Sequence, residues 1–299
     1  MSSLGYIAIL GRQPELGLVE LESVLETPPV AFGRQAALID SALELGRLGG
    51  ALKLGEVLYR GAVKPLRELP LDVTVLATGE GRVTFGLSAY GVRETPRALA
   101  AAGLELKKRL KARGSVRLVQ PSRGLALSAA ELAHNHVLEG GFELLVVSSG
   151  REMVVARTIA HQDVDWYSKR DYGRPARSAK VGMLPPKLAQ ILVNTTHASM
   201  VADPFCGTGV ILQEALLLGR EAQGSDIALE MVTATRENLT WLQEQAPVPL
   251  PAWDADPANA RTVQLPKDCA VVSEGYLGPN LSKAPAQPQL AEIKRDLLG

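Results

Sequence analysis

A glycine-rich loop between an apolar strand and an apolar helix constrains this chain more than any other feature. The loop runs Asp203-Pro204-Phe205-Cys206-Gly207-Thr208-Gly209, with a predicted strand at 200–202 before it and a predicted helix at 210–218 after it. A strand, a glycine loop and a helix in this order open a nucleotide-binding α/β unit. Gly207 and Gly209 lack a Cβ, so the backbone can approach a ligand closely, and the helix N-terminus supplies N–H groups. The loop therefore predicts a parallel α/β sheet with a nucleotide-type ligand.

The residues around this loop narrow the kind of ligand. A phosphate-binding P-loop needs Gly-Lys-Ser/Thr, but Val210 and Ile211 follow the last glycine, and Leu212 stands where a dinucleotide fingerprint needs a third glycine. The next predicted strand, 221–225, ends at Asp226, 17 positions beyond Gly209. A carboxylate there can accept both hydroxyls of a ribose. We expect a nucleoside-containing cofactor without a pyrophosphate.

Two further motifs make the loop resemble a known enzyme family. The segment 203–209 resembles motif I of class I S-adenosylmethionine-dependent methyltransferases. The segments 167–175 (YSKRDYGRP) and 182–190 (GMLPPKLAQ) are similar to the archaeal-type tRNA guanine-N2 methyltransferases that act on position 10. The resemblance implies S-adenosyl-L-methionine as cofactor, tRNA as partner, and ferredoxin-like and THUMP RNA-binding domains ahead of a Rossmann-like catalytic domain.

Carried over residue by residue, the resemblance assigns a cofactor site. It implies that Asp226 holds the ribose, that Asp254 lies near the adenine amine, and that the segment from Pro185 to Gln190 covers the pocket. The loop residues expected to line the pocket are Asp203, Phe205, Gly207 and Gly209.

The target-base motif of that family departs from its usual form here. The motif is an Asp or Asn, then two residues of which the last is proline, then Tyr or Phe, but this chain reads Ser273-Glu274-Gly275-Tyr276. Tyr276 is expected to stack on a flipped guanine, and a polar group would hold its exocyclic amine. With Ser273 in the first position and the carboxylate displaced to Glu274, either Glu274 substitutes or catalysis is weak.

The chain before the glycine loop is predicted to form α+β domains. The first should contain strands at 6–10, 36–39, 73–76 and 83–87 and helices at 14–25 and 43–59. The second should contain a helix that begins at Thr95-Pro96 and ends at Gly114, a strand, a helix capped by Ser128 and a hairpin about 148–150. We therefore expect an N-terminal α+β domain at 1–90, a THUMP-like domain at 91–164, a polar surface linker at 165–180 and the methyltransferase domain at 181–299.

Local charge suggests an RNA-binding surface although the formal net charge is zero. Residues 105–123 contain seven basic residues and one acidic residue, and residues 165–187 contain six basic and two acidic. Such basic patches on a neutral protein are typical of phosphate contacts. The expected RNA-binding residues are Lys107, Lys108, Lys111, Arg170 and Arg174. The alternative for the first run is the solvated face of a helix.

Other function classes find little support. Cys206 and Cys269 lack metal-ligand spacing, so no disulfide framework and no metal site are expected. The four histidines are dispersed and form no triad pattern. No apolar stretch approaches the roughly 20 residues of a membrane span, and no signal peptide is evident, so we expect a cytoplasmic protein.

The last strands suggest an incomplete catalytic sheet. Strands are predicted at 200–202, 221–225, 248–250 and 270–272, and the remaining stretch 290–298 is predicted to be a helix. A class I methyltransferase sheet has seven strands, so we expect a truncated domain, completed by a missing C-terminal segment or by a protein partner. Two functions remain open: a tRNA guanine-N2 methyltransferase, or an RNA-binding protein with an inactive methyltransferase domain. DNA adenine methylation is disfavoured by the RNA-binding half.

Overall fold

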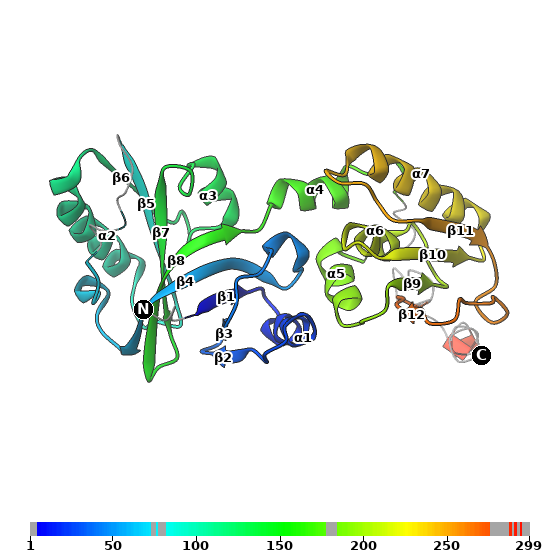
Figure 1. Ribbon diagram of the computed structural model, residues 1–299, viewed down its shortest axis with the longest axis horizontal. Coiled ribbons are helices and arrows are strands. Elements are labelled where there is room, and N and C mark those ends of the chain that lie inside the picture. The colour runs from blue at the N-terminus through cyan, green and yellow to red at the C-terminus, as the bar shows by residue number, and fades with distance from the viewer. Residues whose placement is uncertain are drawn as a thin grey trace. The chain divides into compact units, whose positions relative to one another are not determined.

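The computed structural model describes residues 5–72, 76, 82–177 and 184–275, together with residues 287, 288, 290, 291 and 294. The chain divides into two compact units, Met1–Asp165 and Trp166–Gly299 (Figure 1). In the described part of the chain no helix is long and apolar enough to cross a membrane. Each unit is described by itself.

The N-terminal unit is built on one eight-stranded mixed sheet. Its strand order is β2-β3-β1-β4-β8-β7-β5-β6. The strands are β1 (Tyr6–Leu10), β2 (Val30–Phe32), β3 (Ala36–Ile39), β4 (Ala51–Ala62), β5 (Val83–Tyr90), β6 (Val116–Val119), β7 (Gly141–Ser148) and β8 (Glu152–His161). The helices are α1 (Pro14–Val24), α2 (Pro96–Leu110) and α3 (Ala129–His134). Because β4 pairs along its length with β8, the sheet runs across the domain boundary expected at residue 90.

Local signals predicted most of these elements. Thr95 accepts a hydrogen bond from the Ala98 N–H at the start of α2, and Ser128 forms a capping box with Glu131 at the start of α3. The helix expected at 43–59 is wrong, because β4 occupies Ala51–Ala62 and pairs with β1 on one side and β8 on the other. Long-range strand pairing there overrides local helix propensity. The strand expected at 73–76 lies largely outside the described residues.

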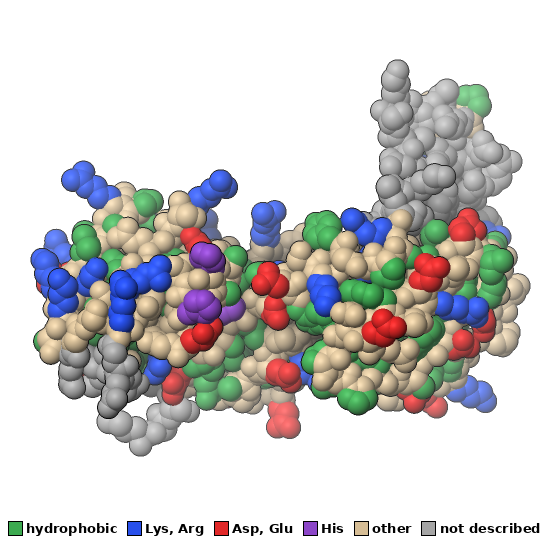
Figure 2. All heavy atoms as spheres, turned by 90° about the horizontal axis from the view of Figure 1, so that it is seen from above, with side chains coloured by type: hydrophobic (Ala, Val, Ile, Leu, Met, Phe, Trp, Pro, Cys, Tyr) green, Lys and Arg blue, Asp and Glu red, His purple; other side chains and the backbone are tan. Residues whose placement is uncertain are grey.

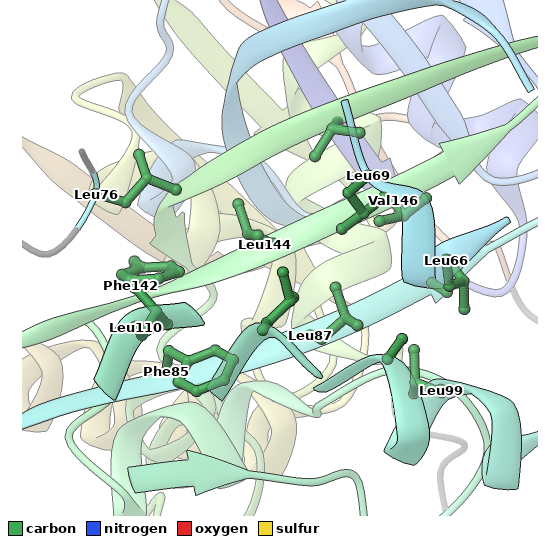
Figure 3. Packing of buried hydrophobic residues seen from close by; sticks show 14 of the residues in the cluster. Leu66, Leu69, Leu76, Phe85, Leu87, Leu99, Leu110, Phe142, Leu144 and Val146 are labelled. Atoms are coloured by element: carbon green, nitrogen blue, oxygen red, sulfur yellow. The ribbon is translucent and has the colours of Figure 1, made fainter. Parts of the chain in front are cut away.

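An apolar core fills the space between α2 and its side of this sheet. The rings of Phe85 and Phe142, from the neighbouring strands β5 and β7, stack with centroids 5.7 Å apart. Figure 3 shows these rings beside Leu110 of α2, with Leu87, Leu99 and Leu144 in the same layer. Burial of such side chains contributes about 1.5–3 kcal/mol each, and this holds α2 on the sheet.

The C-terminal unit is a parallel α/β sheet. Its described strands have the order β11-β10-β9-β12, and every pairing is parallel. The elements are α4 (Val164–Tyr172), α5 (Pro186–Asn194), β9 (Met200–Asp203), α6 (Val210–Leu217), β10 (Glu221–Asp226), α7 (Leu229–Gln245), β11 (Trp253–Pro257) and β12 (Ala270–Val271). Successive strands extend in one direction from β9 to β11, whereas β12 adds on the other side of β9. Open α/β sheets bind ligands at the carboxyl ends of the strands where the order reverses, here between β9 and β12.

Two expectations for this unit need correction. The third strand is not at 248–250 but at Trp253–Pro257. Pro247, Pro249 and Pro251 have no N–H to donate to a ladder, so the earlier stretch cannot pair regularly. The segment 165–180 is not simply a surface linker, because its first part is α4, whose Tyr167 and Arg170 are buried.

Candidate functional site

The glycine loop is shaped by hydrogen bonds from both sides of its turn. Asp203, the last residue of β9, accepts the N–H of Phe205 at 3.0 Å. The Cys206 N–H donates to the carbonyl of Ser225 on β10, and the Gly209 N–H donates to the Cys206 carbonyl at 2.7 Å. Gly207 and Gly209 adopt φ angles of 53° and 80°, a region that favours glycine. The glycines expected at this position are therefore required by the backbone.

Asp226 lies against this loop, as the sequence spacing predicted. Its Oδ2 accepts the Gly207 N–H at 3.0 Å, and its Oδ1 accepts the Ala228 N–H at 3.0 Å. These two amides fix the carboxylate at the carboxyl end of β10. Each carboxylate oxygen can accept a second hydrogen bond, so the group can still receive hydroxyl donors.

The strand that the sequence predicted to carry the target-base motif, β12, meets the glycine loop through Ser273. The Val272 N–H donates to the Ala202 carbonyl at 3.0 Å, which extends the pairing one residue beyond β12. The Ser273 hydroxyl then donates to Asp203 Oδ1 at 2.6 Å. Residues 70 positions apart are thus joined where the strand order reverses. Glu274 follows directly, and Tyr276 lies outside the described residues.

Asp203 has an unusual electrostatic environment. Only 2% of this residue is exposed. Burial raises the pKa of its carboxyl to about 6, although the bonds from Ser273 and Phe205 oppose this shift and the charges of Asp226 and Glu274 add to it. Three carboxyl groups therefore surround one end of the sheet, an arrangement that favours a positively charged ligand.

The pairing register of β11 with β10 shows how far Asp254 lies from the carboxyl end of the sheet. Asp254 pairs with Gln223, whereas Asp256 pairs with Ser225 and Pro257 with Asp226. Asp256 is therefore nearer than Asp254 to the ligand-binding edge, and it forms a 2.7 Å ion pair with Arg236 of α7. The role expected for Asp254 stays a prediction, and Asp256 lies two residues further along the same strand.

Exposed apolar residues beside Asp226 were also missed. Ile227 is 76% exposed and Leu229 62% exposed, both immediately after the carboxylate. The available signal was the apolar residue directly after Asp226, the acid that the sequence predicted to hold a ribose. Phe205, expected in the cofactor site, is 45% exposed in the loop. Pro185 precedes α5, and its carbonyl accepts the N–H groups of Leu188 and Ala189, so it caps that helix.

Arg170 and Arg174 require a correction. Both were expected to contact RNA, but only 2% and 3% of these residues are exposed. Arg170 donates to both carboxylate oxygens of Glu214 on α6, at 2.9 and 3.1 Å, and packs over the ring of Tyr167. A buried bidentate pair satisfies Glu214, and these arginines therefore serve the interior of the unit.

The basic run at the end of α2 and directly after it lies partly at the surface. Lys108 and Lys111 are exposed and Lys107 is half-buried. Lys108 forms an exposed ion pair with Glu105, which costs little to break. Figure 2 shows Lys and Arg side chains gathered over the end of the N-terminal unit that carries α2 and β6. These side chains are placed where they can meet a polyanion.

Nucleophilic chemistry at Cys206 is disfavoured. The residue is buried, and burial raises the pKa of its thiol to about 12. The thiolate, which is the reactive form, is therefore scarce at neutral pH. The side chain packs beneath the loop instead, beside Gly224.

Comparison with known proteins identifies the domain that carries the loop. Residues 174–265 match a family model described as RMKL-like, methyltransferase domain. This segment is a methyltransferase domain. The match covers the glycine loop, Asp226 and β11, and it ends before β12.

A relative that matches part of this chain is itself named a methyltransferase. The chain is 49% identical over 61 residues to the tRNA (guanine(10)-N2)-dimethyltransferase of Methanothermobacter thermautotrophicus, a match that covers 19% of this chain and 18% of that protein. The matched part is thus far less than two thirds of the relative's length.

Two solved structures share the fold. A possible methylase from Clostridium difficile 630 superposes with a TM-score of 0.55 at 15% identity, over 98% of this chain and 82% of that chain. A putative methyltransferase complexed with SAH superposes with a TM-score of 0.55 at 11% identity, over 99% of this chain and 86% of that chain. The Rossmann-like α/β architecture expected for the C-terminal unit is confirmed.

Proposed function

We propose that this chain transfers a methyl group from S-adenosylmethionine to the exocyclic N2 amine of a tRNA guanine, at position 10. The observation that carries the proposal is the bond between Ser273 and Asp203, because it brings the target-base strand against the cofactor loop. The relative named as a tRNA (guanine(10)-N2)-dimethyltransferase supports the choice of substrate. A tRNA substrate would place the protein in the cytoplasm.

The residues at the sheet edge fit this cofactor. Asp226 would accept the ribose hydroxyls, and the exposed side chain of Ile227 offers an apolar surface for the adenine ring. The carboxyl groups of Asp203, Asp226 and Glu274 would favour the positive charge of a sulfonium. When bound, S-adenosylmethionine supplies an electrophilic methyl group.

Glu274 is the side chain that we assign to the target amine. The Ser273 hydroxyl is already engaged with Asp203, whereas the next residue is a carboxylate whose charge is felt at Asp203. A carboxylate that accepts an N–H of the amine would orient its lone pair toward the methyl group and could take up the proton that methylation releases. Tyr276 would stack on the flipped base.

The N-terminal unit would hold the tRNA. Its basic helix α2 presents Lys107 and Lys108, and Lys111 follows at the C-cap of that helix; phosphate contacts of this kind dominate the affinity for nucleic acids. We retain the proposal that residues 91–164 are THUMP-like and that residues 1–90 are a ferredoxin-like support.

Methyl incorporation tests the proposal directly. Unmodified tRNA transcripts incubated with the protein and S-adenosylmethionine should yield N2-methylguanosine, detected by mass spectrometry of nucleosides. Glu274→Gln should lower kcat by about 10²-fold or more, because the amide oxygen can still accept an N–H of the amine but cannot take up the proton that methylation releases. Glu244→Gln, on the exposed face of α7, is the matched control and should retain full activity. Binding of tRNA without methyl incorporation would instead identify an RNA-binding protein with an inactive methyltransferase domain.

A further inference from the structure

Helix α7 forms hydrogen bonds with two consecutive residues of the glycine loop, Gly207 and Thr208. Thr235 Oγ1 donates to the Gly207 carbonyl at 2.9 Å, and Asn238 Nδ2 donates to the Thr208 carbonyl at 2.9 Å. Both side chains are fully buried. Residues three apart lie on the same face of a helix, so one turn of α7 bonds to two successive peptide groups of the loop.

Gly209, the loop residue that follows Thr208, is held by packing against Thr235. A Cβ on Gly209 would lie 3.0 Å from Thr235 Cγ2 and 3.1 Å from Thr235 Oγ1, and Gly209 has a φ of 80°. Thr235 therefore packs directly on the backbone of Gly209. The side chain both bonds to the loop and limits its movement toward α7.

These bonds set the direction of the loop's peptide groups. In a planar trans peptide the C=O of one residue and the N–H of the next point in opposite directions. With the carbonyls of Gly207 and Thr208 bonded to α7, the N–H groups of Thr208 and Gly209 point away from this helix. The Gly209 N–H closes the turn on Cys206. The orientation of donors in the loop thus depends on α7.

A second segment reinforces the same peptide. Residues 173–177, which we call the strap, follow α4. Asn238 Oδ1 accepts the Ala176 N–H and its Nδ2 donates to the Ala176 carbonyl, both at 2.9 Å. Arg174 Nη1 lies 3.4 Å from both the carbonyl and the hydroxyl of Thr208. The Thr208 carbonyl is therefore contacted from both α7 and the strap.

The strap is itself anchored in the interior. The buried pair of Arg170 and Glu214 joins α4 to α6, the helix that begins at the glycine loop. Tyr167 of α4 also donates to the buried Gln190 of α5. Buried pairs of this kind tolerate loss of one partner poorly, so α4 and the strap are fixed to the same framework as the loop.

We propose that Thr235, Asn238 and Arg174 are positioning residues that hold the glycine loop in the conformation that binds S-adenosylmethionine. The inference rests on the proposed function, because the ligand is the cofactor assigned there. None of the three residues acts on the methyl group. Each acts on the cofactor through the peptide groups of Gly207 and Thr208.

Asn238→Asp tests the inference with a nearly isosteric change. The variant keeps an acceptor for the Ala176 N–H but turns an oxygen toward the carbonyls of Ala176 and Thr208. We expect the Kd for S-adenosylhomocysteine, measured by calorimetry, to rise about tenfold or more. The KM for S-adenosylmethionine should rise in parallel, while kcat at saturating cofactor should change little. Thr235→Val, which keeps the packing on Gly209 and removes one bond, should give a smaller rise of the same kind.

Arg220 supplies a matched control for Arg174. Arg220 Nη1 also bonds to a carbonyl and a threonine hydroxyl, those of Val193 and Thr196, but it precedes β10 at the other end of the sheet. Arg174→Met and Arg220→Met should lower the melting temperature of the ligand-free protein to a similar extent. Only Arg174→Met should weaken the binding of S-adenosylhomocysteine.

The outcomes separate the two proposals. Equal affinity in the unaltered protein, Asn238→Asp and Thr235→Val, with only melting temperatures changed, would show that these contacts serve stability alone and would overturn the inference. Failure of the unaltered protein to bind S-adenosylhomocysteine would overturn the cofactor assignment itself, and the positioning role with it. Cofactor binding without methyl transfer to tRNA would contradict the proposed function and leave the positioning result standing.

Discussion

At the scale of single residues, the buried carboxyl of Asp203 lowers the stability of the folded protein when it is ionised. A buried carboxyl resists ionisation, and among the described residues the donors from Ser273 and Phe205 compensate in part. The pKa of Asp203 lies near 6 because burial outweighs these bonds. Active sites commonly retain such groups because ligands change their surroundings.

Asp203→Asn should therefore alter the pH dependence of stability. Because the folded-state pKa is raised from 3.8 to about 6, the carboxyl contributes stability that is fully present below pH 3.8 and is lost as the pH rises through about 6. Asparagine keeps an acceptor for both donors and does not titrate. Between pH 4 and pH 7 the unaltered protein should lose about 2 kcal/mol of unfolding free energy relative to the variant. Urea denaturation of both proteins at the two pH values measures this, and a constant difference would contradict it.

At the scale of elements, the pairing of β5 with β7 depends on one glycine. Gly141 begins β7, and a Cβ at this position would lie 1.6 Å from the carbonyl oxygen of Thr84 on β5. No side chain fits at that distance. The absence of a Cβ therefore allows the two strands to pair and brings Phe85 and Phe142 together.

Gly141→Ala should destabilise the N-terminal unit strongly. The strands must separate locally to admit the methyl group, and we expect a loss of at least about 2 kcal/mol of unfolding free energy. Gly140→Ala is the neighbouring control, because a Cβ on Gly140 meets nothing within 4 Å, and it should change stability by less than about 0.5 kcal/mol. Chemical denaturation measures both values. Similar effects in the two variants would show that β5 can move at Thr84 to admit the methyl group without loss of stability.

At the scale of the whole molecule, a formal net charge of zero conceals an uneven distribution of charge. Basic side chains on α2 are exposed, whereas carboxyl groups gather at the end of the methyltransferase sheet. Local potential rather than net charge steers a polyanion to one surface. The two units therefore suit different ligands.

Replacement of Lys107, Lys108 and Lys111 by Gln should weaken tRNA binding without changing cofactor affinity. Each lost phosphate contact should lower the slope of log K against log salt by up to about 0.9, on the scale of duplex DNA. Filter binding over a range of salt concentrations measures the slope, and calorimetry with S-adenosylhomocysteine is the control. An unchanged slope would show that these lysines do not contact phosphates and belong to the solvated face of a helix.

The sequence alone determined the strand, glycine loop and helix of the methyltransferase domain, and the position of Asp226 against them. Each depends on residues close together in the chain: the glycines that permit positive φ, and the short βαβ spacing that brings two strand ends together. The same holds for the helix caps at Thr95 and Ser128.

Only the tertiary structure decided which charged residues face solvent and which strands pair. Arg170 reads as a basic surface residue until Glu214, 44 positions later, is folded against it. Ser273 meets Asp203 across 70 positions, and β4 is a strand because β1 and β8 flank it. In each case the partner is remote in the chain. Burial and pairing are therefore properties of the folded molecule, which local patterns of sequence do not contain.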